Sequence, residues 1–508
     1  MNAGKIIVVL LILAAFAAGY FLGPGGDDTF VITDRSAGVS YSGGYAGSSD
    51  NSDNEVVAAE DSGVSAARDG QIHTVEDGES IMEAVKRAAP GDTIRVMPGT
   101  YHETVYIDKD DIRIIGVIKQ GQRATMDGEK KLNDAILYSG NGVVVENMLI
   151  KRYRGNAIMG QAGNNFVIRN NIIDDAGVYG IFPQLGRNGI VEHNVISGIE
   201  DAAIYVGMSD NVHVAHNAVF DSVAGIEIEN SRHVIVENNY VYNNTGGVLA
   251  FITPGLPVKT TYDVIIRNNF IVDNNTPNFG ASGSTVAGIP AGTGILIMAA
   301  DDVIIESNII KNNKTVGILI TDHENAPNVT IDPESDPSPD RVMILDNLMT
   351  NNGYDTITEI KALMLTELKG GEPDIVRLGT SRESCILNRH RYVTVGVDKW
   401  KECEFTNTRE IKTYLPDKPV PPIKIPEEEK GKVAYLSICS GCHSYTGRII
   451  GPPVQIIQAL YMDNPEGLAD YIANPVRKRD DYPEMPPQDY LDQETRLAVA
   501  EYMLQVEN

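Results

Sequence analysis

The stretch "AGIEIENSRHVIVENN", residues 224–239, alternates apolar and polar side chains twice and closes on paired asparagines. Such alternation is typical of short β-strands whose side chains point to opposite faces of a sheet. The same pattern recurs along the chain, and its closing residues are Asn147, Asn171, Asn194, Asn217, Asn239, Asn269, Asn308 and Asn347. The successive separations are 24, 23, 23, 22, 30, 39 and 39 residues. A repeat with a period near 23 therefore organises this region, with loops inserted into its later copies.

This period predicts a parallel β-helix with one coil for each repeat. A leucine-rich horseshoe needs a leucine framework, which the repeats lack, and a propeller blade needs a period above about 40 residues. In a β-helix the closing asparagines stack, and each side-chain amide bonds the next one. We therefore interpret these asparagines as structural residues.

Composition shifts divide the rest of the chain. Ser80 and Glu83 form a capping box that predicts a short helix before the first strands. Residues 355–372 show helical periodicity after the last repeats, and prolines crowd the stretch before residue 427. The predicted organisation is 1–22 signal or anchor, 23–70 acidic Gly/Ser linker, 71–408 β-helix, 409–427 Pro-rich linker and 428–508 a small all-α domain.

The N-terminal segment predicts export. Lys5 precedes an uninterrupted apolar run over residues 6–22, and acids follow it, which places the remainder outside the cytoplasm, in the periplasm or at the cell surface. The run is slightly shorter than the ~20 residues that span a bilayer, so both a membrane anchor and a cleaved signal stay open, with the anchor favoured. In an oxidising compartment Cys385 and Cys403 are expected to pair, and reduced core cysteines are the alternative.

The charge balance excludes one class of partner. The chain has 69 acidic and 42 basic side chains, a formal net charge of −27. Nucleic-acid binding needs a cationic face, so this composition argues against it. A surface this acidic suits solubility and attracts cationic partners or a divalent cation.

Near the C-terminus, Cys439, Cys442 and His443 form a CxxCH motif, the arrangement for covalent attachment of one haem c. Two thiols three residues apart can each add to a vinyl group, and the adjoining imidazole then binds the iron. A zinc site is the alternative, but it needs two further ligands, and none is suitably spaced.

Two further residues complete the predicted haem site. The carbonyl of Pro452 is placed to accept the other N–H of the His443 ring. No histidine follows His443, so Met485, in "YPEMPPQDY", is the expected second iron ligand, with Met462 as the alternative. Ligation by histidine and methionine leaves no open iron position and favours electron transfer.

Two resemblances follow from these motifs. Residues 428–508, with a helix, CxxCH, Gly451-Pro452, the "MPP" loop and a terminal helix, resemble a class I cytochrome c. Residues 72–405, with "DGESIMEAVKRAAPGDTIRVMPGTYHE" and "VAGIEIENS", resemble a bacterial family of parallel β-helix repeat proteins within the pectate-lyase-like superfamily. The second resemblance implies fold more than function, because that fold hosts many functions.

One face of the predicted β-helix carries candidate catalytic side chains. Aligning the coils on their small residues places Tyr205 and Glu227 in one column, with Glu229 two places further and Asp201 just before its strand. Paired acids of this kind suit a glycoside hydrolase, or a Ca²⁺ site in a lyase, with the tyrosine as a sugar platform. The alternative is a solvated acidic face. Two charged triplets on later coils, Asp322-His323-Glu324 and Arg389-His390-Arg391, are weaker candidates.

Three functional hypotheses result. The first is an exported electron-transfer protein, served by a redox partner protein, whose β-helix presents a binding face to a polysaccharide or protein. The second is a carbohydrate-active β-helix lyase, epimerase or hydrolase with an accessory cytochrome, and the third is a surface adhesin. The insertions "TPGLPVKTT" and "TPNFGASGSTVAGIPAG" are expected to form a binding rim in each case.

Overall fold

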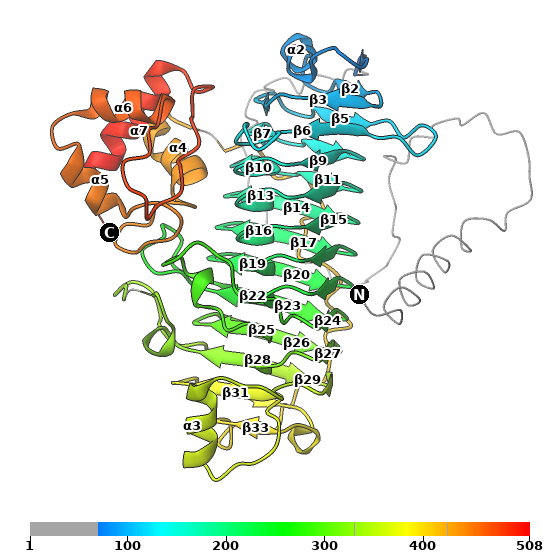
Figure 1. The fold of residues 1–508 in the computed structure, drawn as a ribbon, viewed down its shortest axis with the longest axis vertical. Helices are drawn as coiled ribbons and strands as arrows, with labels where there is room; N and C mark the ends of the chain where they lie inside the picture. The colour runs from blue at the N-terminus through cyan, green and yellow to red at the C-terminus, as the bar shows by residue number, and fades with distance from the viewer. Residues whose placement is uncertain (1–69, 330, 424, 508) are drawn as a thin grey trace, which may run out of the picture. The chain divides into compact units, whose positions relative to one another are not determined.

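The computed structural model describes residues 70–329, 331–423 and 425–507. Most of them form coils whose strands build three parallel sheets, as Figure 1 shows. The mainly β architecture that the repeat predicted is therefore confirmed. The predicted signal or anchor segment and all but the last residue of the predicted linker lie outside the described residues. Within the described part of the chain, no helix is both long enough and apolar enough to cross a membrane.

Each complete coil contributes one strand to each sheet. The 12-stranded sheet contains β1 (Ile72–Val75), β2 (Thr93–Val96), β5 (Arg113–Gly116), β8 (Val144–Glu146), β11 (Val167–Arg169), β14 (Arg187–Glu192), β17 (Asp210–Ala215), β20 (Arg232–Glu237), β23 (Tyr262–Arg267), β26 (Asp301–Glu306), β29 (Met343–Leu345) and β32 (Cys385–Ile386). The 11-stranded sheet contains β4 (Val105–Ile107), β7 (Ile136–Tyr138), β10 (Ile158–Gln161), β13 (Tyr179–Gln184), β16 (Ala202–Gly207), β19 (Ala224–Glu229), β22 (Gly246–Phe251), β25 (Thr293–Met298), β28 (Val316–Thr321), β31 (Ile375–Leu378) and β33 (Thr394–Val395). The 10-stranded sheet contains β3 (Gly99–Tyr101), β6 (Ala124–Asp127), β9 (Leu149–Lys151), β12 (Ile172–Asp174), β15 (Val195–Ser197), β18 (Ala218–Phe220), β21 (Tyr240–Tyr242), β24 (Phe270–Val272), β27 (Ile309–Lys311) and β30 (Leu348–Thr350). The complete coils run from β2 to β31, and β1, β32 and β33 belong to incomplete coils at the two ends.

Helices lie before, within and after the coils. Helix α2 (Ile81–Arg87) begins after Ser80, whose side chain accepts a hydrogen bond from the Glu83 amide, as predicted. Helix α3 (Thr358–Thr366) lies between β30 and β31, within the last coils. The C-terminal segment, residues 427–507, contains α4 (Lys430–Ala434), the π-helix η5 (Tyr435–Cys439), α5 (Val454–Leu460), α6 (Pro465–Ala473) and α7 (Gln493–Gln505). These few helices do not by themselves show the predicted cytochrome c domain.

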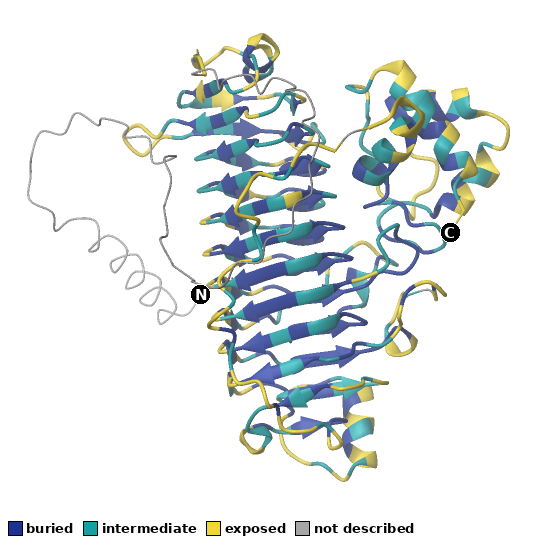
Figure 2. Cartoon of the chain, turned by 180° about the vertical axis from the view of Figure 1, so that it is seen from behind, coloured by how far each residue is buried: buried dark blue, intermediate teal, exposed yellow. Residues whose placement is uncertain are grey.

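Aliphatic stacks fill the interior of the coils. Ile204, Ile226 and Val248 occupy equivalent positions in successive strands, and each side chain is fully buried. Burial of one such side chain contributes roughly 1.5–3 kcal/mol, so the repeating stack is the main stabilising feature of the region. Figure 2 shows the strands as mostly buried and the turns between them as more exposed.

An asparagine ladder runs along one turn, as predicted. The side-chain oxygen of Asn217 accepts from the backbone and side-chain amides of Asn194, and each asparagine repeats this with its successor. The ladder members are Asn171, Asn194, Asn217, Asn239, Asn269, Asn308 and Asn347. The assignment of Asn147 to it was wrong, because the equivalent position is Met148, whose amide bonds Asn171.

A second ladder, missed from the sequence, runs along the next turn through Asn244, Asn274, Asn313 and Asn352. The sequence signal for this ladder is the pair of adjacent asparagines that contains each member, as in Asn243-Asn244 and Asn312-Asn313. Together the two ladders satisfy backbone groups that the turns bury.

The proline-rich stretch lies against the 12-stranded sheet. Arg267 of β23 donates to the carbonyls of Thr408 and Ile411, at 3.0 and 2.7 Å. Asn211 of β17 donates to the Tyr414 carbonyl at 2.9 Å, and Asn165, before β11, receives the Val420 amide at 2.8 Å. As residues 408–420 proceed, their contacts pass from β23 to β17 and then to the start of β11, so this stretch runs back along the sheet toward the earlier coils.

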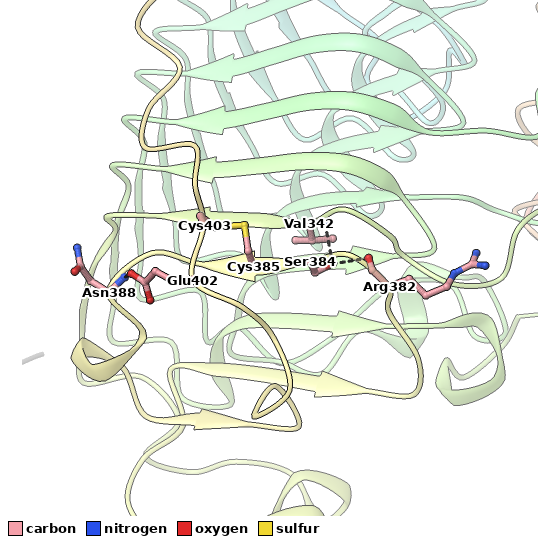
Figure 3. The surroundings of a disulfide bond; sticks show 7 residues. All are labelled: Val342, Arg382, Ser384, Cys385, Asn388, Glu402 and Cys403. Atoms are coloured by element: carbon pink, nitrogen blue, oxygen red, sulfur yellow. Dashed lines mark hydrogen bonds between the residues drawn. A yellow bond between two sulfur atoms is a disulfide. The ribbon is translucent and has the colours of Figure 1, made fainter.

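A disulfide joins Cys385 and Cys403, which are 18 residues apart, in the last coils (Figure 3). Closing a loop of this size stabilises a fold by about 3 kcal/mol. We therefore expect the double variant Cys385→Ser/Cys403→Ser to lose about that much in urea unfolding followed by circular dichroism. Reductant should destabilise the wild type and leave the double variant unchanged; equal midpoints for the two proteins would contradict the expectation.

Candidate functional site

The outer face of the 11-stranded sheet carries the predicted acids. Tyr205 of β16 lies opposite Glu227 of β19, and Glu229 lies opposite Gly207, so the predicted column is present. Asp201 immediately precedes β16. Alternation along each strand turns these side chains away from the coil interior, which is filled by residues such as Ile226 and Ile228.

The acids are buried, contrary to both an open groove and a solvated face. The exposed fractions are 5% for Asp201, 2% for Glu227 and 2% for Glu229. The cover is the C-terminal segment: Gln184 of β13 donates to the Leu436 carbonyl at 3.1 Å and to the Ser440 hydroxyl at 3.3 Å. The side-chain amide of Gln161, in β10, donates to the Tyr490 hydroxyl at 2.6 Å.

Burial shifts the protonation of all three acids. Loss of solvent, and next the charge of Glu229, raises the pKa of Asp201 well above its ordinary value. Loss of solvent, and next the charge of Asp201, does the same to the pKa of Glu227. Desolvation also raises the pKa of Glu229 to about 7, and the Tyr205 hydroxyl donates to its carboxyl group. Both shifts favour the protonated form of the carboxyl group over the ionised form.

Several polar atoms on this face have no partner within the described residues. They are Asp201 Oδ1, Glu227 Oε2, Asn156 Oδ1, Gln161 Oε1 and Gln184 Oε1. Buried polar atoms are normally satisfied, and each one left without a partner costs about 1–3 kcal/mol. A row of such atoms on one face indicates that the face is built to meet a hydrogen-bonding ligand or water.

Aromatic rings adjoin the acids. Tyr179 and Tyr205 stack with centroids 4.5 Å apart and planes 11° from parallel, and Phe182 lies 4.5 Å from Tyr205 at a tilt of 51°. Burial raises the pKa of Tyr179 well above its ordinary value. The rings give the acids a low-dielectric boundary, which strengthens every electrostatic interaction at the site.

A cavity of about 330 Å³ lies between the sheet face and the C-terminal segment. Asn156 and Phe182 line it from the sheet side. From the C-terminal segment it is lined by the residues predicted as a haem site, Cys439, Cys442, His443, Pro452 and Met485. Cys439 and Cys442 are free thiols.

Contacts inside the motif fix the His443 ring. The ring Nδ1 of His443 donates to the Pro452 carbonyl at 2.8 Å. Burial lowers the pKa of His443 below its ordinary value. Met462, the alternative to Met485, is 72% exposed and does not line the cavity.

The cofactor prediction needs correction. Within residues 70–329, 331–423 and 425–507, no group of three or more His, Cys, Asp or Glu side chains could hold a metal ion. Neither the CxxCH motif nor the acids around Glu227 forms such a group. The haem c and the Ca²⁺ ion are therefore not assigned to the chain. The predicted electron-transfer role, which rested on the haem, is unsupported.

The weaker sequence candidates have other roles. Asp322 caps the short 3-10 helix η2 (His323–Asn325), and the ring of His323 donates to the Ile252 carbonyl at 2.9 Å. Arg391 pairs with Asp346 on the last coils. The insertion after β22 contacts the cover, since its Gly255 carbonyl accepts from the Tyr445 amide at 3.1 Å.

Sequence reasoning missed Gln161 and Gln184. Both occupy the outward position that Glu229 occupies two or three coils later, so the same coil alignment contained them. They were overlooked because amides, unlike carboxylates, do not suggest acid–base chemistry.

Comparisons with known proteins address the fold. No curated protein matches the sequence. Similar solved structures include the mannuronan C-5 epimerase AlgE4 A-module of Azotobacter vinelandii, at 14% identity and TM-score 0.41, covering 62% of this chain and 83% of that one. An alginate lyase of Paenibacillus sp. str. FPU-7 is 12% identical with TM-score 0.42, covering 56% of this chain and 99% of that one. DFA-IIIase of Arthrobacter chlorophenolicus A6, without its lid, is 13% identical with TM-score 0.41, covering 67% and 100%.

These likenesses carry no functional inference. The family model described as "Right handed beta helix region" matches residues 127–253 and 224–334. The matched residues coincide with the coils from β6 to the loop after β28. The three parallel sheets of the structure agree with that description over the matched residues.

Proposed function

We propose that the chain is a carbohydrate-active enzyme whose site is the outer face of the 11-stranded sheet from β10 to β19. The observation that carries this proposal is the buried acid pair Asp201 and Glu227, each with a raised pKa and an oxygen atom without a partner. Cleavage of a glycosidic bond needs a carboxylic acid that keeps its proton at neutral pH and a second carboxyl group that does not.

The pair supplies both forms. Because each negative charge disfavours the other, the two groups do not ionise together, and one retains a proton when the other has lost it. The protonated member donates to the leaving oxygen of the saccharide, and the ionised member acts as base or nucleophile. Tyr205 holds Glu229 through its hydroxyl group, and the rings of Tyr179 and Phe182 offer an apolar surface to a sugar ring.

A polysaccharide panel tests the proposal. The wild type, Glu227→Gln and Asp201→Asn are incubated with neutral, amino-sugar and uronate polymers, and the products are analysed by mass spectrometry. We expect turnover of at least one polymer, reduced at least about a hundredfold in each variant through loss of general acid–base catalysis. Glu192→Gln, on the 12-stranded sheet, is the matched control and should match the wild type. Saccharide binding without turnover would favour the adhesin hypothesis instead.

We infer, further, that the protein acts outside the cytoplasm. The apolar run at residues 6–22 and the disulfide Cys385–Cys403 support export, because disulfides persist in oxidising compartments. Fractionation of the native host, with detection of the chain in the periplasmic or surface fraction, tests this inference. Recovery in the cytoplasmic fraction alone would refute it.

A further inference from the structure

The acids of the sheet face are unreachable in the structure. Tyr205 has an exposed fraction of 0%, and Glu227 one of 2%. The C-terminal segment contacts Gln184 and Phe182 of the same face. Gly441 of this segment approaches so closely that a Cβ atom there would lie 2.7 Å from the ring of Phe182. A polysaccharide therefore cannot reach Glu227 in this state of the protein.

The hydrogen bonds under the cover resemble those of a saccharide. The Tyr490 hydroxyl accepts from the amide of Gln161 and donates to Gln488, and the Ser440 hydroxyl accepts from the amide of Gln184. The two hydroxyl groups thus accept from the glutamine amides in the column of Glu229, while the carbonyl oxygens of both glutamines lack partners. Hydroxyl groups of a sugar offer donors as well as acceptors and so satisfy both atoms of each amide.

We propose that residues 427–507 form a lid that closes the acid face, and that Gln161 and Gln184 are saccharide-binding residues which Tyr490 and Ser440 occupy in the closed state. The inference rests on the proposed function for its ligand, a hydroxyl-rich polymer. The closure itself rests on the contacts alone.

The packing suits a lid that opens as a body. The segment has a hydrophobic core of its own, which includes Tyr435, Val454, Leu468 and Val499. Its apolar contacts with the β-helix include those of Tyr490 and of Ile449, which packs with Met208 and Leu256. The interface includes the cavity of about 330 Å³, so it lacks the dense packing of a continuous core. The proline-rich stretch is the covalent connection and remains attached to the 12-stranded sheet.

Hydroxyl-radical footprinting of the full chain tests the closure. In the wild type Tyr179 and Tyr205 should be protected from oxidation. Gly441→Leu, whose side chain collides with Phe182, should raise their labelling about tenfold by shifting the population toward the open state. Gly370→Leu is the matched control, since a Cβ atom there meets nothing within 4 Å. Labelled tyrosines in the wild type, or protected ones in Gly441→Leu, would overturn the lid.

Exchanging the charges of an ion pair between the sheet and the lid distinguishes opening of the lid from misfolding of a variant. Arg154, on the sheet side, pairs with Glu484 of the cover. Arg154→Glu alone should raise the labelling of Tyr205, and the double variant Arg154→Glu/Glu484→Arg should restore protection. Failure of the double variant to restore protection would count against opening as the cause.

Activity separates the two proposals. Both proposals are supported if the wild type turns over a polysaccharide and Gly441→Leu, with raised labelling of Tyr179 and Tyr205, is faster than the wild type at low substrate concentration. If labelling rises but Gly441→Leu gains nothing over an active wild type, the lid does not gate the site and is overturned. If no protein turns over any polymer while labelling rises, the lid stands and the proposed function fails. For the amides, Gln184→Leu should raise KM more than it lowers kcat, and an unchanged KM would remove Gln184 from the saccharide site.

Discussion

Replacing Asn239 by alanine is expected to lower the free energy of unfolding by about 4 kcal/mol. The Asn239 side chain is fully buried and makes four hydrogen bonds. It donates to the Val214 carbonyl and Asn269 Oδ1, both at 3.0 Å, and accepts from the backbone and side-chain amides of Asn217, at 2.9 and 3.0 Å. Alanine removes all four bonds and leaves the backbone amide of Asn217 without this acceptor, in a turn that water does not reach.

The control is the asparagine that the sequence pattern wrongly assigned to the ladder. Asn147 has a φ of 64°, which glycine adopts freely, so Asn147→Gly removes a side chain without straining the backbone. Urea unfolding followed by circular dichroism should show a loss for Asn147→Gly of less than about 1 kcal/mol. Similar losses for both variants would mean that the ladder contributes no special stability.

The stability of the wild type is expected to fall as the pH rises from about 4.5 to 7. The pKa of Glu229 is about 7 in the folded chain, against an ordinary value of 4.5. Over this range the unfolded chain has lost the proton while the folded chain retains it, so a rising pH favours unfolding. The shift corresponds to about 3 kcal/mol, fully present as stabilisation below pH 4.5 and lost as the pH passes 7. Asp201 and Glu227 act in the same direction.

The variant Glu229→Gln isolates this contribution. Glutamine does not ionise and can still accept from the Tyr205 hydroxyl, so the slope of stability against pH should become shallower. Glu192→Gln, on the 12-stranded sheet, should keep the wild-type slope. Urea midpoints measured at intervals between pH 4 and 8 provide the comparison. Parallel curves of midpoint against pH for all three proteins would refute a cost of ionising Glu229 in the folded chain.

The coil architecture could be predicted because each repeat carries its own evidence. Alternation fixes which side chains enter the coil, and the asparagine that ends each strand fixes the register, so neighbouring coils determine each other. The error at Asn147 arose because the first asparagine of the pattern falls one place before the ladder position, and periodicity alone does not resolve a shift of one residue.

The state of the candidate site could not be predicted in the same way. The column of Tyr205 and Glu227 followed from the coil alignment, but the contacts of Gln184 and Gln161 on the same face are with Ser440 and Tyr490, more than 200 residues away. No period relates those segments, so nothing local indicates that they meet. The raised pKa values are consequences of burial and were equally hidden.

The return of the proline-rich stretch to early coils has a consequence for biosynthesis. Glu229 leaves the ribosome about 200 residues before α4 is made, so at roughly 5–20 residues per second the acid face stays bare for about 10–40 s. During that interval its carboxylates are hydrated and charged. Completing the nascent chain therefore expels water and takes up protons in one late event, which makes the final docking of the carboxy-terminal residues pH-dependent.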